Sequence, residues 1–435
     1  MAQKKPIKPA LKKANSRQPI ANSQAKRDYT IILLWVMIVV VSAIRYRLIT
    51  VPFERDEGEY GYIGNLFLHG VAPFKDAYSM KLPGTSFMYS ILMLIFGHTN
   101  TGVHTGVVFI NAATMYFLYT AFKKIFNPFI GLATATIYGF MAIGLVFDGF
   151  AAHATHFICF YSSIALFFLA DYLKSGKPLK VFLCGLMFGM AFLMKQQAVF
   201  LILFGGLILL IHLKTEKKQS FVEIVKNLPP FAAGVFIPYI IVLLIIAASG
   251  EFSVFWLWTV KYASTYESVK DMQMIIALFN STFVAAWYVF YHLWLLALAG
   301  LIVLYLSPFT RFQKVFAALY VLASVLVVSS GFYFRQHYFI ALLPAMGLLI
   351  GIFIEYVTKL AKALKSQYVP VVALAVVVLF TIYVNHVYYF EQTSAAVCDN
   401  AYWGNPFNQA KDIAKYIKDR TKDTDKVAIL GSEPE

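Results

Sequence analysis

Charged side chains are scarce in this sequence. Aspartate, glutamate, lysine and arginine supply 14% of its 435 residues, against about 25% in soluble domains. Hydrophobic residues make up 60% of the chain, which is more than a water-soluble fold can hide. The composition excludes a soluble globular protein and predicts one that is embedded in a membrane.

Cysteine is also rare, and several catalytic signatures are missing. The three cysteines, Cys159, Cys184 and Cys398, are scattered along the chain, which excludes a disulfide framework and a CxxC metal pair. The sequence contains no glycine-rich phosphate-binding loop, no serine nucleophile elbow and no HExxH pattern. Redox chemistry, nucleotide hydrolysis and proteolysis are therefore unsupported.

The basic residues are unevenly placed. The formal net charge is +15, and the lysines and arginines cluster in short segments between long apolar runs. Such clusters orient a protein in a membrane, whereas nucleic-acid binding calls for one basic face. The pattern predicts contact with membrane lipids and no nucleic-acid partner.

About eleven apolar segments have close to the usual length of a membrane-crossing helix, roughly 17 to 25 residues. We expect the first, residues 29–44, to remain uncleaved, because Arg45 and Arg47 follow it without a small-residue cleavage site. The other expected spans are residues 103–122, 129–147, 157–173, 179–194, 198–213, 228–248, 283–306, 312–328, 338–354 and 369–387. The predicted fold is an all-α polytopic membrane domain over residues 29–388.

The lysine-rich connections set the orientation. Residues 1–28 are polar and basic and are expected to form a cytoplasmic tail. Threading the spans from this tail places every lysine-rich loop on the cytoplasmic side, in agreement with the positive-inside bias. The extracytoplasmic side then receives residues 50–101, 250–282, 331–337 and 389–435. The chemistry is expected on this second side.

Two parts of the outer side have structure of their own. Residues 58–69 and 82–96 are apolar but too short to span, and we expect helices that lie in the membrane interface. Residues 389–435 read as the start of an extracytoplasmic α/β domain, with an amphipathic helix over 408–420 and a strand over 426–430. Because the chain stops directly after that strand, we expect this domain to be truncated.

An acidic cluster follows the first span. It contains Glu54, Asp56, Glu57 and Glu59, with Arg55 among them. Carboxylates at the membrane surface can remove a proton from an incoming hydroxyl or hold a divalent metal. The alternative interpretation is a solvated acidic loop without a catalytic role.

Three isolated cations lie in predicted outer turns, where the positive-inside bias gives no reason for them. They are Lys81, Lys195 and Arg335. An anionic partner such as a lipid phosphate would explain all three, since arginine offers a forked pair of donors and lysine a point charge. Snorkelling of each side chain to the interface is the alternative.

Histidines and aromatic residues add weaker signals. His153 and His156 are three residues apart, which predicts that both rings lie on one helical face and could ligate a divalent metal. Ordinary interfacial histidines are the alternative. His337, two residues after Arg335, is a candidate for contact with donor or acceptor. The outer aromatic residues fit an interfacial belt or a sugar-stacking surface.

Four stretches together resemble the GT-C glycosyltransferases of the protein mannosyltransferase and lipid A aminoarabinose transferase type. They are FERDEGEY at 53–60, KLPG at 81–84, GMAFLMKQQA at 189–198 and RQHYFIALLPA at 335–345. Their order and topological side agree with the family. The sequence departs from it at Leu82 and Gly84, where relatives have prolines, and at 149–157, where His153 and His156 stand in place of an asparagine and a glutamate.

The resemblance implies an inverting sugar transfer on the extracytoplasmic face of the plasma membrane. It assigns Asp56 as the general base, with Glu57 assisting in acceptor or metal contact. Lys81, Lys195 and Arg335 would neutralise the phosphate of a polyprenyl-phosphate carrier and stabilise it as it departs. The remaining candidates for substrate contact are Glu59, Tyr60, His153, His156, His337 and Tyr338.

The predicted activity is therefore transfer of a hexose or pentose from a polyprenyl-phosphate donor to a hydroxyl on a lipid, glycan or protein. No cofactor is chemically required, and a divalent metal stays open. A transporter or flippase of lipid-linked saccharides is the main alternative. Transport usually calls for ionisable groups within the spans, whereas Asp148 and Asp171 are placed at span ends.

Overall fold

The computed structural model describes residues 28–265, 271–361, 368–422 and 424–425. Throughout these residues the regular structure is helical, and no strand occurs among them. The predicted all-α fold is confirmed. The predicted basic tail, apart from Asp28, and the predicted strand at 426–430 lie outside the described residues.

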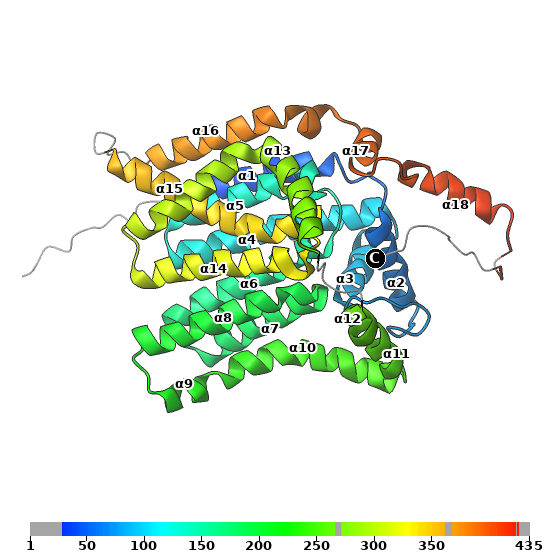
Figure 1. Ribbon diagram of the computed structural model, residues 1–435, viewed down its shortest axis with the longest axis horizontal. Helices are drawn as coiled ribbons and strands as arrows, with labels where there is room; N and C mark the ends of the chain where they lie inside the picture. Colours follow the sequence, from blue (N-terminus) through cyan, green and yellow to red (C-terminus); the bar gives the residue numbers. More distant parts are fainter. Residues whose placement is uncertain (1–27, 266–270, 362–367, 423, 426–435) are drawn as a thin grey trace, which may run out of the picture.

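One set of helices forms a bundle, and the others lie toward its two ends (Figure 1). The helices of the bundle are α1 Thr30–Tyr46, α4 Asn100–Ile125, α5 Pro128–Met141, α6 Ala154–Ser175, α7 Pro178–Met194, α8 Val199–Ile211, α10 Pro229–Ala248, α13 Met272–Leu306, α14 Arg311–Ser329, α15 Leu343–Leu360 and α16 Val369–Val384. The other helices are α2 Arg55–Leu68, α3 Gly84–Phe96, α9 Phe221–Asn227, α11 Phe252–Trp256, α12 Ala263–Thr265, α17 Ser394–Ala401 and α18 Ala410–Lys418.

The two ends of the bundle differ. Helices α2 and α3 lie at one end, here named the α2 end, and α9 lies at the opposite end, the α9 end (Figure 1). The predicted interfacial helices are thus α2 and α3, and the predicted amphipathic helix at 408–420 is α18. These two predictions of helical structure are confirmed.

Seven helical segments of the described chain are long and apolar enough to cross a membrane. Four shorter apolar helices, α1, α5, α7 and α16, coincide with predicted spans. The described helices therefore include one for each of the eleven predicted segments, and the protein is an integral membrane protein. The number of crossings stays a prediction, because those four helices have 14 to 17 residues.

Small residues allow α7 and α10 to pack backbone to backbone. A Cβ atom at Gly185 would lie 2.2 Å from the carbonyl oxygen of Phe231, and one at Gly189 would lie 2.4 Å from that of Val235. Glycine pairs four residues apart are typical of membrane helices that approach closely. This contact matters for the site, because Lys195 directly follows α7.

One predicted span ends early. The sequence placed its end at residue 147, but α5 ends at Met141. The chain then turns through η1, Leu145–Phe147, and the guanidinium of the buried Arg45 donates to the carbonyl oxygens of Ala142 and Gly149. A buried arginine that takes two backbone carbonyls stabilises a loop where apolar sequence alone predicts a helix.

Candidate active site

The acidic cluster forms the first turn of α2. The Glu54 side chain accepts a hydrogen bond from the backbone N–H of Glu57 at 3.0 Å, and the Glu57 side chain accepts one from the backbone N–H of Glu54 at 3.4 Å. This reciprocal capping box fixes the start of the helix, and the helix dipole favours carboxylates there. Asp56 lies between the two residues, so its backbone is held in place.

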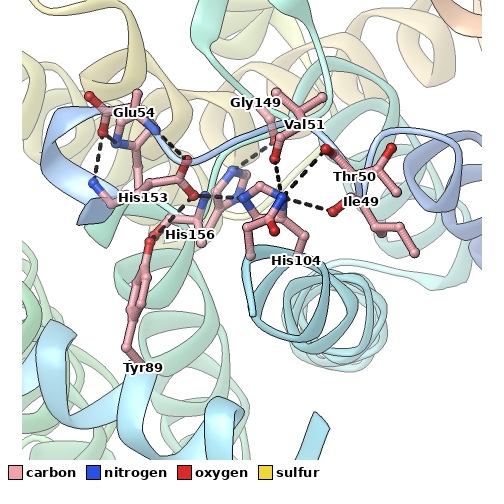
Figure 2. A network of polar contacts seen from close by, with 12 residues as sticks. Ile49, Thr50, Val51, Glu54, Tyr89, His104, Gly149, His153 and His156 are labelled. Atoms are coloured by element: carbon pink, nitrogen blue, oxygen red, sulfur yellow. Dashed lines mark hydrogen bonds and ion pairs between the residues drawn. The ribbon is translucent and has the colours of Figure 1, made fainter. Parts of the chain in front are cut away.

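Glu57 is fully buried and joins several segments. Its Oε1 accepts from the backbone N–H of Ala152 at 2.6 Å, from Nε2 of His104 at 2.8 Å and from the hydroxyl of Tyr89 at 3.4 Å. The other ring nitrogen of His104, Nδ1, lies 3.2 Å from the carbonyl oxygen of Ile49 (Figure 2). Both ring nitrogens of His104 thus face oxygen atoms, and these two contacts hold the ring in one orientation.

Lys81 connects the acidic turn to the loop before α3. Its Nζ donates to Asp56 Oδ1 at 3.1 Å and to Glu59 Oε2 at 3.0 Å, and it lies 4.7 Å from the ring centroid of Tyr60. The side chains of Asp56, Lys81 and Glu59 keep 14 to 15% of their surface exposed. A substrate can therefore reach this cluster, whereas Glu57 below it is closed off.

The charges around Asp56 set its protonation. Burial alone would raise the pKa of the Asp56 carboxyl. The positive charges of Lys81 and Lys195 outweigh burial and hold this pKa below its usual value. Asp56 is therefore ionised at neutral pH and can accept a proton.

The KLPG segment packs directly on the end of α7. A Cβ atom at Gly84 would lie 2.4 Å from the carbonyl oxygen of Leu193, and the Thr85 hydroxyl donates to the carbonyl oxygen of Met194 at 2.8 Å. Only glycine permits this approach. Gly84 thus allows the loop of Lys81 to lie against the turn of Lys195.

Gly84→Ala should push these two segments apart. We expect the variant to lose thermal stability, since overpacking typically costs about 1 to 3 kcal/mol, and to bind a polyprenyl phosphate more weakly. Scanning fluorimetry and a lipid-binding assay would measure both effects. Gly206→Ala is the matched control, because the nearest atom to its added Cβ is a ring carbon of Phe231 at 3.6 Å. Unchanged behaviour of Gly84→Ala would contradict the close approach.

The two glutamines after Lys195 connect its turn to two other segments. The Gln196 side chain donates to the carbonyl oxygen of Met80 at 3.3 Å, and the Gln197 side chain donates to that of Ser330 at 3.4 Å. The turn is therefore hydrogen-bonded to the loop that precedes Lys81 and to the loop that leads to residue 335.

Lys195 and Arg335 belong to the same site as Lys81. The Nζ atom of Lys195 lies 3.7 Å from the ring centroid of Tyr338. His337 interacts electrostatically with the side chains of Lys81, Lys195 and Arg335. The structure thus brings together three cations that are far apart in the sequence.

The ring of His153 stacks on that of His337, with centroids 4.0 Å apart, and neither of its buried nitrogens has a hydrogen-bond partner among the described residues. His153 is the N-cap of α6, and His156 lies in the first turn of that helix, where its Nε2 is 3.1 Å from the carbonyl oxygen of Gly149. A joint role of His153 and His156 in metal binding stays a prediction.

One group of side chains could hold a cation. A carboxylate oxygen of Asp56 and one ring nitrogen each of His153 and His337 lie within 4.8 Å of one another. Burial lowers the pKa of His153 to about 4, so its ring is neutral at physiological pH and has a lone pair to offer. The donor set suits zinc or a similar divalent ion.

Asp148 is a second buried acid beside the site. Its backbone is left-handed, with φ 47°, and the side-chain amide nitrogen of Gln336 donates to Oδ2 at 2.8 Å and to Oδ1 at 3.1 Å. Burial, and then the charges of Glu57 and Asp56, raise the pKa of Asp148 to about 8. Asp148 is therefore mostly protonated at neutral pH.

A raised pKa makes a specific prediction for Asp148→Asn. An acid whose pKa is higher in the folded than in the unfolded protein costs stability as pH rises from about 4 to about 8, because only the unfolded chain releases the proton. The melting temperature of the wild type minus that of the variant should thus decrease as the pH rises from 5 to 8. Scanning fluorimetry at both pH values tests this, and a constant difference would contradict a buried neutral Asp148.

Sequence reasoning missed His104 and the neutral state of Asp148. His104 lies in α4, a predicted span, and an ionisable residue in such a helix is itself a functional signal. Its partner Glu57 could not be identified from spacing, because 47 residues separate them. The predicted candidates Glu59, Tyr60 and Tyr338 do lie beside the three cations, as described above.

Part of the chain matches a known protein family. Residues 80–248 match the sequence model of a family described as dolichyl-phosphate-mannose-protein mannosyltransferase. This range includes Lys81, Gly84 and Lys195, but neither Asp56 nor Arg335. No curated protein sequence matches the chain.

Solved structures of other proteins share the fold. ArnT from Cupriavidus metallidurans, bound to undecaprenyl phosphate, matches with a TM-score of 0.61 and 15% identity over 91% of this chain and 81% of ArnT. The oligosaccharyltransferase of Archaeoglobus fulgidus matches in its apo form with a TM-score of 0.60 and 13% identity over 92% of this chain. This chain spans 59% of the archaeal one.

The archaeal enzyme in complex with an inhibitory peptide and a dolichol-phosphate matches with a TM-score of 0.55 and 14% identity. That alignment covers 91% of this chain and 59% of the archaeal one. The chain is therefore a membrane protein whose fold is similar to that of ArnT and of the archaeal oligosaccharyltransferase, and part of its sequence is similar to protein mannosyltransferases.

Proposed function

We propose that the protein is an inverting glycosyltransferase that moves a sugar from a polyprenyl-phosphate carrier to a hydroxyl of a lipid, glycan or protein. The α2 end would face the extracytoplasmic side of the plasma membrane, with the N-terminus in the cytoplasm. One observation carries the proposal. An ionised carboxylate, Asp56, is paired with Lys81, feels the charge of Lys195 and adjoins His337, which feels the charge of Arg335.

Asp56 acts as the general base in this proposal. The acceptor oxygen attacks the anomeric carbon from the side opposite the phosphate, a new C–O bond forms, and the C–O bond to the phosphate breaks. The acceptor proton passes to Asp56, and the carrier phosphate leaves with the electron pair. One base and one attack give inversion at the anomeric carbon.

Lys195 and Arg335 are the proposed phosphate clamp. Fixed cations stabilise an anion that gains charge as it departs, and they do so more strongly in a site shielded from water. Lys81 is paired with Asp56 and Glu59, so it also orients the base. The lipids bound in two of the similar solved structures, undecaprenyl phosphate and dolichol-phosphate, support this class of donor.

The other candidate residues either contact the substrate or hold the site in place in this proposal. Glu59, Tyr60 and Tyr338 adjoin the cations and are proposed to contact the substrate. Glu57 was expected to assist in acceptor or metal contact. Its buried carboxylate is occupied by protein donors, and we propose that it supports transfer by holding α2 in place.

No cofactor is required for this chemistry, and we expect transfer to persist after treatment with EDTA. Asp56, His153 and His337 would hold a divalent cation if the enzyme uses one, and the ion would then polarise the acceptor oxygen. Metal content measured by plasma mass spectrometry, beside turnover, separates the two cases. Turnover that is lost with EDTA and restored by zinc would overturn the metal-free mechanism.

A flippase for lipid-linked saccharides remains the alternative. The ionisable groups described above gather at the α2 end and do not form a path along the bundle, which favours the enzyme. Mass spectrometry of lipid, glycan and protein fractions, with and without the gene, tests the proposal and identifies the acceptor. Loss of one sugar-modified product is expected, whereas unmodified products and a misplaced lipid-linked sugar would support the flippase.

A further inference from the structure

A cavity of about 340 Å³ lies at the α9 end of the bundle, remote from the proposed active site. It is formed where the C-terminal ends of α4 and α6 meet η3, His212–Glu216, and the start of α14. Apolar side chains make up one part of its wall, including Leu173 and Phe312. A hollow with apolar and basic walls suits an amphipathic ligand.

The polar part of the wall is mainly cationic. It carries Lys124, Lys174 and Arg311, against one acid, Glu216. Lys124 is also paired with Asp171 outside the cavity. Among the described residues neither Lys174 nor Arg311 forms an ion pair with a carboxylate, so their charges are available to a ligand.

The first turn of α14 also lines the cavity. Thr310 caps this 19-residue helix, and its hydroxyl accepts from the backbone N–H of Gln313 at 3.2 Å. The backbone N–H groups of Arg311 and Phe312 have no acceptor in the described part of the chain. The N-terminus of a helix with free N–H groups and a positive dipole favours a bound anion.

A buried histidine points to a ligand independently. His212 lines the cavity and is 6% exposed, and its Nε2 has no hydrogen-bond partner among the described residues. An unpaired buried imidazole nitrogen costs free energy that a bound acceptor could recover. The positive-inside bias explains lysines at one end of a membrane protein, but it requires neither a cavity nor this histidine.

We propose that this cavity binds the phosphate group of an anionic lipid, with Lys174, Arg311 and the start of α14 as its donors. The lipid chains would leave along the apolar wall. This inference does not depend on the proposed sugar transfer, because the cavity lies at the other end of the bundle. Free inorganic phosphate offers the same chemistry, and the test separates the two sources.

Native mass spectrometry of the purified full chain with phosphatidylglycerol or phosphatidylcholine would test the proposal. The wild type should retain phosphatidylglycerol preferentially, and Lys174→Gln with Arg311→Gln should reduce its retention at least fivefold. Lys214→Gln with Lys226→Gln is the matched control, because it removes two exposed positive charges from the same end but outside the cavity. Equal melting temperatures would show that all three proteins are folded.

Addition of inorganic phosphate distinguishes the sources. Phosphatidylglycerol that persists in millimolar phosphate supports a lipid site, and its displacement supports a phosphate site that free phosphate can fill. Equal retention of phosphatidylglycerol by the wild type and both double variants would overturn the proposal. Equal retention of phosphatidylcholine and phosphatidylglycerol by the wild type would overturn it as well.

Discussion

Asp56→Asn should reduce sugar transfer by about a thousandfold, within the range of roughly 10² to 10⁴ that a positioned general base contributes. The amide keeps the size of the side chain but cannot accept the acceptor proton. The described hydrogen bond of the Asp56 side chain is to Lys81, which keeps Glu59 as a second partner. Folding should therefore be little affected.

The measurement is restoration of the missing sugar-modified product in a deletion strain. The wild-type gene should restore it, and Asp56→Asn should leave it at about 1% of that level or less. Asp76→Asn is the matched control, because Asp76 is an exposed acid of the same outer segment. Full restoration by Asp56→Asn, at equal expression, would remove Asp56 from the role of base.

Lys195→Ala and Arg335→Ala should each weaken binding of undecaprenyl phosphate at least tenfold. A hydrogen bond between charged groups contributes about 1.5 to 3 kcal/mol, and 1.4 kcal/mol corresponds to a factor of ten. The double variant should lose about a hundredfold if the two cations act on one phosphate. Arg335→Lys should recover only part of the affinity, because it keeps the charge but loses the forked donor.

Titration of the purified protein with the lipid, followed by native mass spectrometry, measures these affinities. Lys261→Ala controls for loss of a positive charge, because Lys261 is exposed in η4, Leu257–Tyr262, after α11. Wild-type affinity in either single variant would contradict the phosphate clamp. Equal losses in Lys261→Ala would show a general charge effect instead.

The membrane fold and the principal candidate site residues could be predicted from the sequence, because each has a physical signature there. Lys81, Lys195 and Arg335 oppose the charge bias that explains most other cations, so a different cause had to be sought. Periodicity and length located the helices, because membrane helices are limited by bilayer thickness. The convergence of the three cations depends on tertiary structure, through contacts such as that between Gly84 and Leu193.

The remaining features depend on contacts that local patterns do not encode. Glu57 was indistinguishable from Asp56 in the sequence, yet one is fully buried and the other is accessible. The His153–His337 stack joins residues almost two hundred positions apart. The early end of α5 requires Arg45 to reach across to its carbonyl groups, which an apolar run alone cannot indicate.

A structure of the protein determined with bound undecaprenyl phosphate would test the central claim most directly. The account predicts the phosphate at the α2 end, within about 3.5 Å of both Lys195 Nζ and the Arg335 guanidinium, with Asp56 facing the carbon that carries the sugar. A phosphate bound away from these cations, or an Asp56 side chain closed off from it, would contradict the account.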